Sequence, residues 1–281
     1  MNVAELRKNL TASFRGHRFE SPEIEADYIV SEVLHVRGFE LLLHDPDPVT
    51  PEQLAQADSF LERRLRNEPY QYIFGWTPFR EIDLKVGPGV LIPRPETEFI
   101  LDFVLKKLPR NAVVCELGTG SGAISLSLAS ERPDLTVYGS ELSPEAFRWS
   151  ELNRKALALP NVHFFSGSLY EPFPAGLRFD AVVANLPYVA EEERADLPPN
   201  VRDYEPPEAL FAPDGGCAVI EQAVREAPDH LKTEGAQLFF EIGETQGERL
   251  RRFTLSQGFF TVAEILPDQY GVPRLLYAAR T

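Results

Sequence analysis

The sequence is poor in cysteine and has no long apolar run. Cys115 and Cys217 are the only two cysteines among 281 residues. Two thiols cannot build the disulfide framework of a small secreted domain, so we expect two buried apolar residues in a reducing compartment. No stretch approaches the roughly 18 apolar residues of a membrane span, and the first ten residues lack the apolar region of a signal peptide. We therefore expect a cytoplasmic protein, mature as written, with no membrane partner.

Basic residues are also scarce. The chain has 28 Lys and Arg against 43 Asp and Glu, which gives a formal net charge of −15 at pH 7. Because affinity for a phosphate backbone comes mainly from neutralising basic side chains, this balance disfavours a direct nucleic-acid partner. The five histidines show no metal-ligand spacing, so we expect no metal site.

Apolar side chains, at 43% of residues, are sufficient for two globular domains. Residues 1–75 have a helical pattern. Ser21-Pro22-Glu23 predicts a helix start whose apolar period stops at Gly38, and Thr50-Pro51-Glu52-Gln53 predicts a capping box at the start of another helix. Residues 76–95 are rich in proline, glycine and β-formers, which predicts a hairpin linker.

Residues 96–281 alternate short apolar runs with helical stretches, an order that predicts a parallel sheet covered on both faces. The predicted strands are 112–117, 135–141, 161–165, 180–185 and 236–242, and the predicted helices are 97–108, 122–132, 144–157 and 215–232. Two final strand-like runs, FFTVAEILP and PRLLYAAR, predict an antiparallel hairpin at one sheet edge. This α/β, Rossmann-like pattern resembles the class I S-adenosylmethionine-dependent methyltransferases.

A glycine-rich loop follows the first predicted strand of this region. In Glu116-Leu117-Gly118-Thr119-Gly120-Ser121-Gly122, the glycines let the backbone approach a ligand at a helix N-terminus. With Ala123 the loop also satisfies the dinucleotide fingerprint, so by itself it leaves two cofactor classes open. Glu141 ends the next predicted strand and fits the acid that binds a ribose diol in either class.

Glu116 favours S-adenosylmethionine over a dinucleotide. A carboxylate at the mouth of the loop would oppose a pyrophosphate, whereas the ammonium and sulfonium of S-adenosylmethionine favour an acid nearby. Ser168 stands where many methyltransferases have an aspartate that holds the adenine, and Leu169 is expected to pack against that base. The candidate cofactor contacts are Glu116, Gly118, Thr119, Gly120, Ser121, Gly122, Glu141, Ser168, Leu169 and Asn185.

The motif Asn185-Leu186-Pro187-Tyr188 closes the fourth predicted strand, beside the glycine loop. It is similar to the Asn-Pro-Pro-Tyr motif of methyltransferases that act on a planar nitrogen. The Asn185 oxygen and the main-chain carbonyl of Leu186 can each accept one N–H of such a nitrogen, which aims it at a methyl donor. Pro187 fixes the backbone, and Tyr188 is expected to pack against the planar group. These four residues form the candidate catalytic set.

Four longer segments carry a more specific resemblance. They are Glu68–Gly75, Leu91–Glu98, Tyr204–Leu210 and Asp214–Gly216. They are similar to the release factor glutamine methyltransferase family, known as HemK or PrmC, over nearly the whole chain. The resemblance implies N5 methylation of the glutamine in the Gly-Gly-Gln loop of class I peptide chain release factors, with S-adenosylmethionine as donor.

The resemblance also suggests roles for two parts of the chain that carry no chemistry motif. We expect the helical domain to dock the release factor. Arg94 lies in the segment Leu91–Glu98, and we expect it to contact the substrate, to stiffen the linker, or both. Asn185, Pro187 and Tyr188 complete the candidate substrate contacts.

Three other functions stay open at this stage. Ribosomal protein glutamine methyltransferases share many of the same segments. Leu186, where glutamine methyltransferases usually have proline, is familiar from adenine dimethyltransferases and suggests an adenine N6-methyltransferase, although such an enzyme needs a basic stripe that is absent here. Ser168 in place of an aspartate suggests a module that binds S-adenosylmethionine without turnover.

Overall fold

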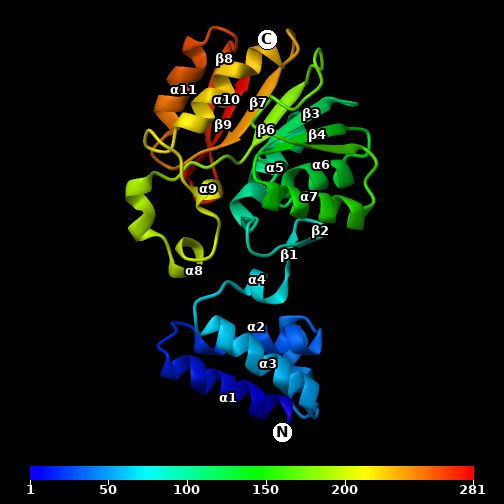
Figure 1. Ribbon diagram of the computed structural model, residues 1–281, viewed down its shortest axis with the longest axis vertical. Helices are drawn as coiled ribbons and strands as arrows, with labels where there is room; N and C mark the ends of the chain where they lie inside the picture. Colours follow the sequence, from blue (N-terminus) through cyan, green and yellow to red (C-terminus); the bar gives the residue numbers. More distant parts are fainter. The chain divides into compact units, whose positions relative to one another are not determined.

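A computed structural model describes all residues, Met1–Thr281, and they divide into two compact units, Met1–Phe74 and Gly75–Thr281 (Figure 1). The predicted division placed a separate linker at 76–95. In the structure these residues belong to the second unit, because the short hairpin they form packs its apolar side chains into that unit's core. No helix is long and apolar enough to cross a membrane.

The first unit is helical. It contains α1 (Val3–Gly16), α2 (Pro22–Leu34), the 3-10 helix η1 (Gly38–His44), α3 (Pro51–Arg64) and α4 (Tyr70–Phe74). The capping box predicted at Thr50 is present, with Thr50 and Gln53 bonded reciprocally. The Ser21 hydroxyl makes no capping bond, and α2 ends before Gly38 because His35 adopts a left-handed conformation, with φ of 54°.

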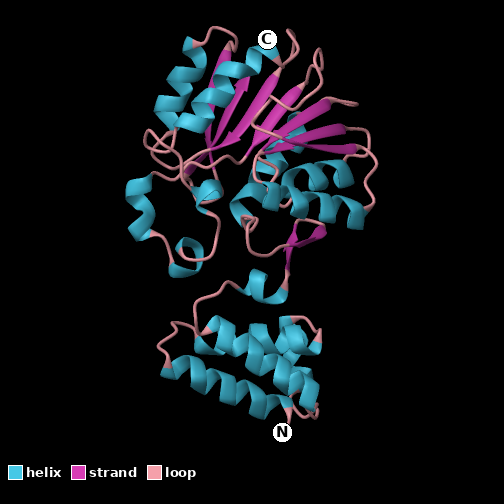
Figure 2. Cartoon of the chain, viewed as in Figure 1, coloured by secondary structure: helices cyan, strands magenta, loops and turns pink.

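The second unit is built on a seven-stranded sheet of order β5-β4-β3-β6-β7-β9-β8 (Figure 2). Its strands are β3 (Val113–Leu117), β4 (Thr136–Glu141), β5 (Val162–Ser166), β6 (Ala181–Ala184), β7 (Gln237–Glu241), β8 (Val262–Pro267) and β9 (Pro273–Ala279). Strands β3 to β7 are parallel, and β8 and β9 form the predicted antiparallel hairpin at one edge. A separate hairpin joins β1 (Trp76–Phe79) to β2 (Ile82–Lys85).

Helices cover both faces of this sheet, so its central strands are apolar on both sides (Figure 1). One face carries α5 (Pro95–Lys107), α6 (Ala123–Glu131) and α7 (Pro144–Leu157), and the other carries α10 (Ala218–Glu226) and α11 (Gly247–Ser256). The helix predicted over 215–232 is shorter in the structure. It ends before Pro228, which lacks the N–H an α-helix needs, and continues as the 3-10 helix η3 (Ala227–Asp229).

A long connection between β6 and α10 contains elements that the sequence did not predict. They are the 3-10 helix η2 (Glu191–Asp196), α8 (Pro199–Arg202) and α9 (Pro207–Leu210). Each is too short to show a helical apolar period, which is why pattern reasoning passed over them. This connection starts at the carboxyl edge of the sheet, where ligands of open α/β sheets bind.

One ion pair in the helical unit generates a stability prediction. Arg64 donates two hydrogen bonds to Glu25, at 2.7 and 2.9 Å, and its guanidinium lies over the rings of Phe19 and Tyr70. We expect Arg64→Met to lower the free energy of unfolding by about 3 kcal/mol, because the Glu25 carboxylate would lose its counter-charge and keep only the Tyr70 hydroxyl, at 2.6 Å, as a donor. Urea unfolding followed by circular dichroism measures the loss.

The matched control is another arginine in the same unit. Arg15 pairs with Glu23, but both side chains are more than 60% exposed. We expect Arg15→Met to cost less than about 1 kcal/mol, because water screens an exposed pair. Equal losses in the two variants would contradict the role given to Arg64.

Candidate active site

The glycine loop joins β3 to α6 and presents its backbone to a cavity. Gly118 and Gly120 have φ of 71° and 54°, values that residues with a Cβ rarely adopt. The amides of Gly118 and Thr119 both donate to the Ser140 carbonyl, at 2.9 and 3.0 Å, which ties the loop to the end of β4. These contacts at the strand ends fix the loop, and Gly118 and Gly120 both line the cavity.

Glu141, at the end of β4, lines the cavity, and the backbone fixes its carboxylate. Its two carboxylate oxygens accept from the amides of Gly120 and Ser143, each at 2.8 Å. Burial raises the pKa of this carboxyl, and the backbone donors act in the opposite direction. Each oxygen retains a further lone pair, so the carboxylate can accept two more hydrogen bonds from a ligand.

The cavity beside this loop has a volume of about 630 Å³, within the range of sites for organic cofactors. Eight of the predicted site residues line it: Gly118, Gly120, Glu141, Ser168, Leu169, Asn185, Leu186 and Pro187. Leu169 is a non-glycine residue with positive φ, 45°, in the turn that follows β5. The structure thus gathers residues from the ends of four strands, β3 to β6, around one space.

Asn185 follows β6 and presents an oxygen to the cavity. Its amide nitrogen donates to the Thr97 hydroxyl at 3.1 Å, and no protein group donates to its Oδ1. Leu186 is 5% exposed and lies against Gly118, where an added Cβ would meet the Leu186 side chain at 3.2 Å. The motif and the glycine loop are therefore in direct contact.

Tyr188 lies away from the cavity lining. Its hydroxyl donates to Glu241 at 3.1 Å, and burial is the main cause that raises the pKa of its phenol. The packing of Tyr188 against a planar substrate group stays a prediction, because this side chain is directed into the protein. Its carbonyl has a clear structural role, since it accepts from Gln246 Nε2 at 2.8 Å.

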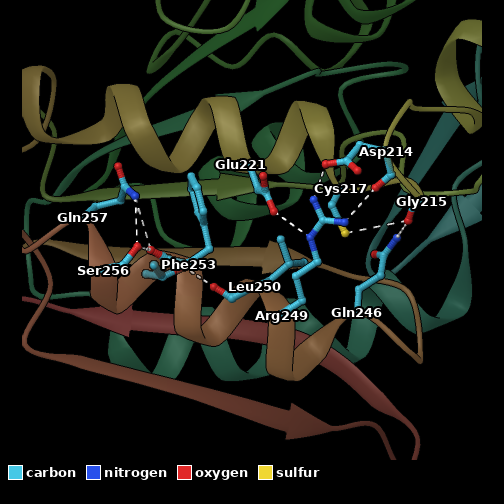
Figure 3. A network of polar contacts seen from close by, with 11 residues as sticks. Asp214, Gly215, Cys217, Glu221, Gln246, Arg249, Leu250, Phe253, Ser256 and Gln257 are labelled. Carbon is cyan, nitrogen blue, oxygen red and sulfur yellow. Dashed lines mark hydrogen bonds and ion pairs between the residues drawn. The ribbon is translucent and has the colours of Figure 1, made fainter.

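Gln246 joins the Tyr188 carbonyl to the segment Asp214–Gly216. The same Nε2 donates to the Gly215 carbonyl at 2.9 Å (Figure 3). Gly216 has φ of 79°, and a Cβ there would lie 1.9 Å from the Tyr188 oxygen, so only glycine fits. Arg249 on α11 pairs with both Asp214 and Glu221, which fixes the same segment from its other side (Figure 3).

Glu116 lies beneath the loop and not at its mouth, where the sequence argument placed it. Alternate residues of β3 face opposite sides of the sheet, so Glu116 points toward α6, where it accepts from the amide and hydroxyl of Ser125. It is 2% exposed, and burial raises the pKa of its carboxyl to about 8. At neutral pH this group is largely protonated, so it does not supply the negative charge expected of it.

The other predicted residues outside the lining have structural partners. Thr119 and Ser121 are each 3% exposed within the loop, and Gly122 caps α6. Arg94 pairs with the fully buried carboxylate of Glu205, which also accepts from the Ile92 amide at 3.0 Å. The linker role predicted for Arg94 thus has a contact in the structure, whereas its substrate contact stays a prediction.

Comparison with known proteins gives matches over both units. The model of the PrmC N-terminal domain matches residues 5–75, and that of the methyltransferase small domain matches residues 96–198. A release factor glutamine methyltransferase of Thermodesulfovibrio yellowstonii is 36% identical over 256 residues, 90% of each chain. The same enzyme of Coxiella burnetii is 30% identical over 282 residues, covering 100% of this chain and 99% of its own. The chain belongs to the release factor glutamine methyltransferase family.

A solved structure supports the fold. A methyltransferase from Pyrococcus furiosus superposes with a TM-score of 0.54 at 18% identity, covering 72% of this chain and 90% of its own. The predicted class I methyltransferase fold, with its mostly parallel sheet, antiparallel C-terminal strands and preceding helical region, is confirmed.

Several cavity residues of this family member were not predicted individually. They come from the segment before α5, from the start of α7, from the α9 segment and from α10: Gly89, Val90, Leu91, Ser143, Glu145, Pro206, Glu208, Phe211, Val219 and Gln222. Leu91, Pro206 and Glu208 fall in segments that carried the family resemblance. The Arg94–Glu205 pair joins the two walls of the cavity that these distant segments form.

The position of Glu116 predicts an unusual pH dependence of stability. Its pKa is about 8 in the folded chain, against about 4.5 when exposed, so between these pH values the folded state binds the extra proton. Stability therefore falls as the pH rises through this range. We expect Glu116→Gln, which stays neutral, to gain roughly 2 to 4 kcal/mol relative to the wild type between pH 5 and pH 8.5.

Urea unfolding at both pH values measures this difference. Glu151→Gln is the control, because Arg154 lowers the pKa of Glu151 and its titration lies below this range. Its difference from the wild type should stay constant from pH 5 to pH 8.5. A constant difference for Glu116→Gln as well would overturn the assignment of a neutral buried carboxyl.

Proposed function

We propose that this chain transfers the methyl group of S-adenosylmethionine to the side-chain nitrogen N5 of the glutamine in the Gly-Gly-Gln loop of class I peptide chain release factors. The relatives that support this bear the name release factor glutamine methyltransferase. The observation that carries the proposal is the Asn185 oxygen, which faces the cavity beside the glycine loop without a protein donor. It provides an acceptor for an amide N–H at the place where a methyl donor fits.

The cavity residues fit S-adenosylmethionine. The Gly118 and Gly120 backbone admits a ligand closely, the spare lone pairs of Glu141 match a ribose diol, and Leu169 offers an apolar surface to an adenine. When bound there, the cofactor supplies an electrophilic methyl group on a sulfonium. Ser168 lines the same space and can exchange a hydrogen bond with the base.

The amide nitrogen of glutamine is a poor nucleophile, because its lone pair is delocalised into the carbonyl. The Asn185 oxygen and the main-chain carbonyl of Leu186 can accept its two N–H groups and hold the nitrogen in the attacking orientation. Pro187 restricts φ and so limits the movement of that carbonyl. The nitrogen lone pair would form the new bond to the methyl carbon as the carbon–sulfur bond breaks and its electron pair stays on sulfur, leaving a neutral thioether. One N–H proton would then leave to water, so no general base is required.

The alternatives predict different substrates for the same site. A ribosomal protein glutamine would use the acceptors in the same way, and so would an adenine amine. Family membership and the net charge of −15 favour the release factor over both, and we expect no direct binding of nucleic acid. The reaction would take place in the cytoplasm, where translation ends.

Mass spectrometry of candidate substrates tests the proposed function directly. The enzyme and S-adenosylmethionine are incubated separately with release factor, ribosomal proteins and ribosomal RNA. We expect one methyl group on the Gly-Gly-Gln glutamine and none elsewhere. A release factor with glutamate in place of that glutamine is the control, because it lacks the amide. Methylation of RNA or of a ribosomal protein alone would overturn the proposal.

The catalytic role of Asn185 gives a kinetic prediction. Asn185→Ala removes an acceptor that matters most as the nitrogen becomes pyramidal, so we expect kcat to fall about 10²- to 10³-fold. The affinity for S-adenosylhomocysteine, measured by calorimetry, should change little, since the glycine loop and Glu141 are intact. Near-normal single-turnover methylation by this variant would contradict the mechanism.

The helical unit is the proposed docking region for the release factor. Three large apolar side chains on η1 are exposed: Phe39 at 76%, Leu42 at 66% and Leu43 at 77%. Exposed apolar side chains grouped on one short segment are typical of protein-binding surfaces. No residue of the helical unit lines the cavity, so this unit would contribute to substrate affinity and not to the chemical step.

Substitution of this segment tests the docking role. We expect Phe39→Ser combined with Leu43→Ser to raise the KM for release factor at least about tenfold, the loss of roughly 1.4 kcal/mol or more of binding. Cofactor affinity should not change. Leu152→Ser and Tyr270→Ser, at exposed apolar positions of the second unit, are the controls. Equal effects of all these variants would show that η1 has no special part in docking.

A further inference from the structure

A buried hydroxyl and a buried carboxylate lie behind Asn185. Thr97 is in the first turn of α5 and is 4% exposed, and Glu241 ends β7 and is 1% exposed. The Thr97 hydroxyl donates to Glu241 Oε2 at 2.7 Å and accepts from Asn185 Nδ2 at 3.1 Å. The other carboxylate oxygen, Oε1, accepts from the Tyr188 hydroxyl at 3.1 Å. Neither Thr97 nor Glu241 lines the cavity, so neither can touch a ligand there.

The sheet brings these groups together. Strands β6 and β7 are parallel neighbours in which Ala184 pairs with Phe240, so the next residues, Asn185 and Glu241, lie at the same level. Glu241 and Phe239 share one face of β7, and that face is covered by α5. The start of α5 therefore places Thr97 between the two side chains.

The direction of these hydrogen bonds determines how the Asn185 amide lies. A hydroxyl has one hydrogen, and an ionised carboxylate can only accept. When Thr97 gives its hydrogen to Glu241, its oxygen can only accept from Asn185, so Nδ2 must face Thr97 and Oδ1 must face the cavity. If the amide rotated by half a turn, the Asn185 oxygen would face the Thr97 oxygen, and neither has a hydrogen to share. The amide N–H groups would then face the substrate nitrogen.

The hydrogen bonds to Glu241 counteract the effect of its burial. The pKa of its carboxyl is raised, mainly by burial, and the hydroxyls of Thr97 and Tyr188 and the charge of Arg274 act in the opposite direction. Both oxygens have a donor in the structure. The two donors therefore hold the carboxyl group of Glu241 in one position, where it can accept from Thr97.

We propose that Thr97 and Glu241 are positioning residues that hold the Asn185 amide with its oxygen toward the cavity. This inference rests on the proposed function, because an oxygen acceptor matters only if the substrate presents N–H groups. It extends the set of functional residues to two positions that are 88 and 56 residues from Asn185 in sequence. Thr97 makes the contact with Asn185, so its effect on the reaction passes through that amide.

A pair of substitutions at Thr97 tests the role. Thr97→Val keeps the shape and removes the hydroxyl, and we expect single-turnover methylation to slow about 10- to 100-fold with the KM for release factor little changed. Thr97→Ser restores the hydroxyl and should recover most of the lost rate. If the valine variant reacts at the wild-type rate, or the serine variant is as slow as valine, the proposal is wrong.

A double-mutant cycle separates positioning from a general structural role. In the Asn185→Ala background there is no amide left to orient, so Thr97→Val should change the rate less than about twofold. A further 10-fold slowing would mean that Thr97 acts by another route and would overturn the proposal. If the valine variant does not fold, Thr97→Ala removes the same hydroxyl and takes its place in the cycle. It should likewise have little effect in the Asn185→Ala background.

Nuclear magnetic resonance distinguishes failure of this inference from failure of the proposed function. The side-chain amide signals of Asn185 are assigned by their disappearance in Asn185→Ala, and no substrate is needed. We expect them to shift in Thr97→Val and to stay near their wild-type positions in Thr97→Ser. Unshifted signals in the valine variant would refute the positioning role. Shifted signals in an enzyme that does not methylate release factor would refute the proposed function instead.

Discussion

The parallel pairing of β3 with β6 is the contact on which the site depends. Leu117 pairs with Ala184, so the next residues of the two strands, Gly118 and Asn185, leave the sheet side by side. One strand continues into the loop that fits a cofactor, and the other into the loop that provides the acceptor. Because both loops start from hydrogen-bonded strand ends, their separation is set by the sheet and not by flexible connections.

Four buried glutamates near these two loops have different roles, which depend on the groups that each one contacts. Glu141 accepts from two backbone amides and keeps lone pairs for a ligand, whereas Glu205 joins two walls of the cavity through Arg94. Glu116 is neutralised by burial, and Glu241 orders hydroxyls. A buried carboxyl costs stability unless it is bonded or protonated, and each of these four satisfies one of those conditions.

Local patterns were enough to predict the framework. All five parallel strands, the final hairpin and the loop from Glu116 to Gly122 follow from apolar runs and glycine spacing, because these features involve residues close in sequence. The alternation along β3 also indicates the direction of Glu116, because Cys115 and Leu117 pack into the core on one face and Glu116 must face the other. The roles of Glu205, Gln246 and Thr97 were not accessible in this way. Their partners lie 31 to 144 residues away, and only the folded chain brings them together.

The pairing of Arg94 with Glu205 has a consequence for dissecting or recombining members of this family. The matched methyltransferase region starts at residue 96, which makes that position a natural choice for a fusion junction. Such a chimera would delete both Arg94 and the Ile92 amide, the two donors to a carboxylate with no exposed area. Its catalytic half would then have an unpartnered charge in one wall of the cavity, whatever foreign module preceded it. A junction at Gly75 keeps both donors. The segment that must be transferred to keep the catalytic unit intact is therefore longer than the region that the family model matches.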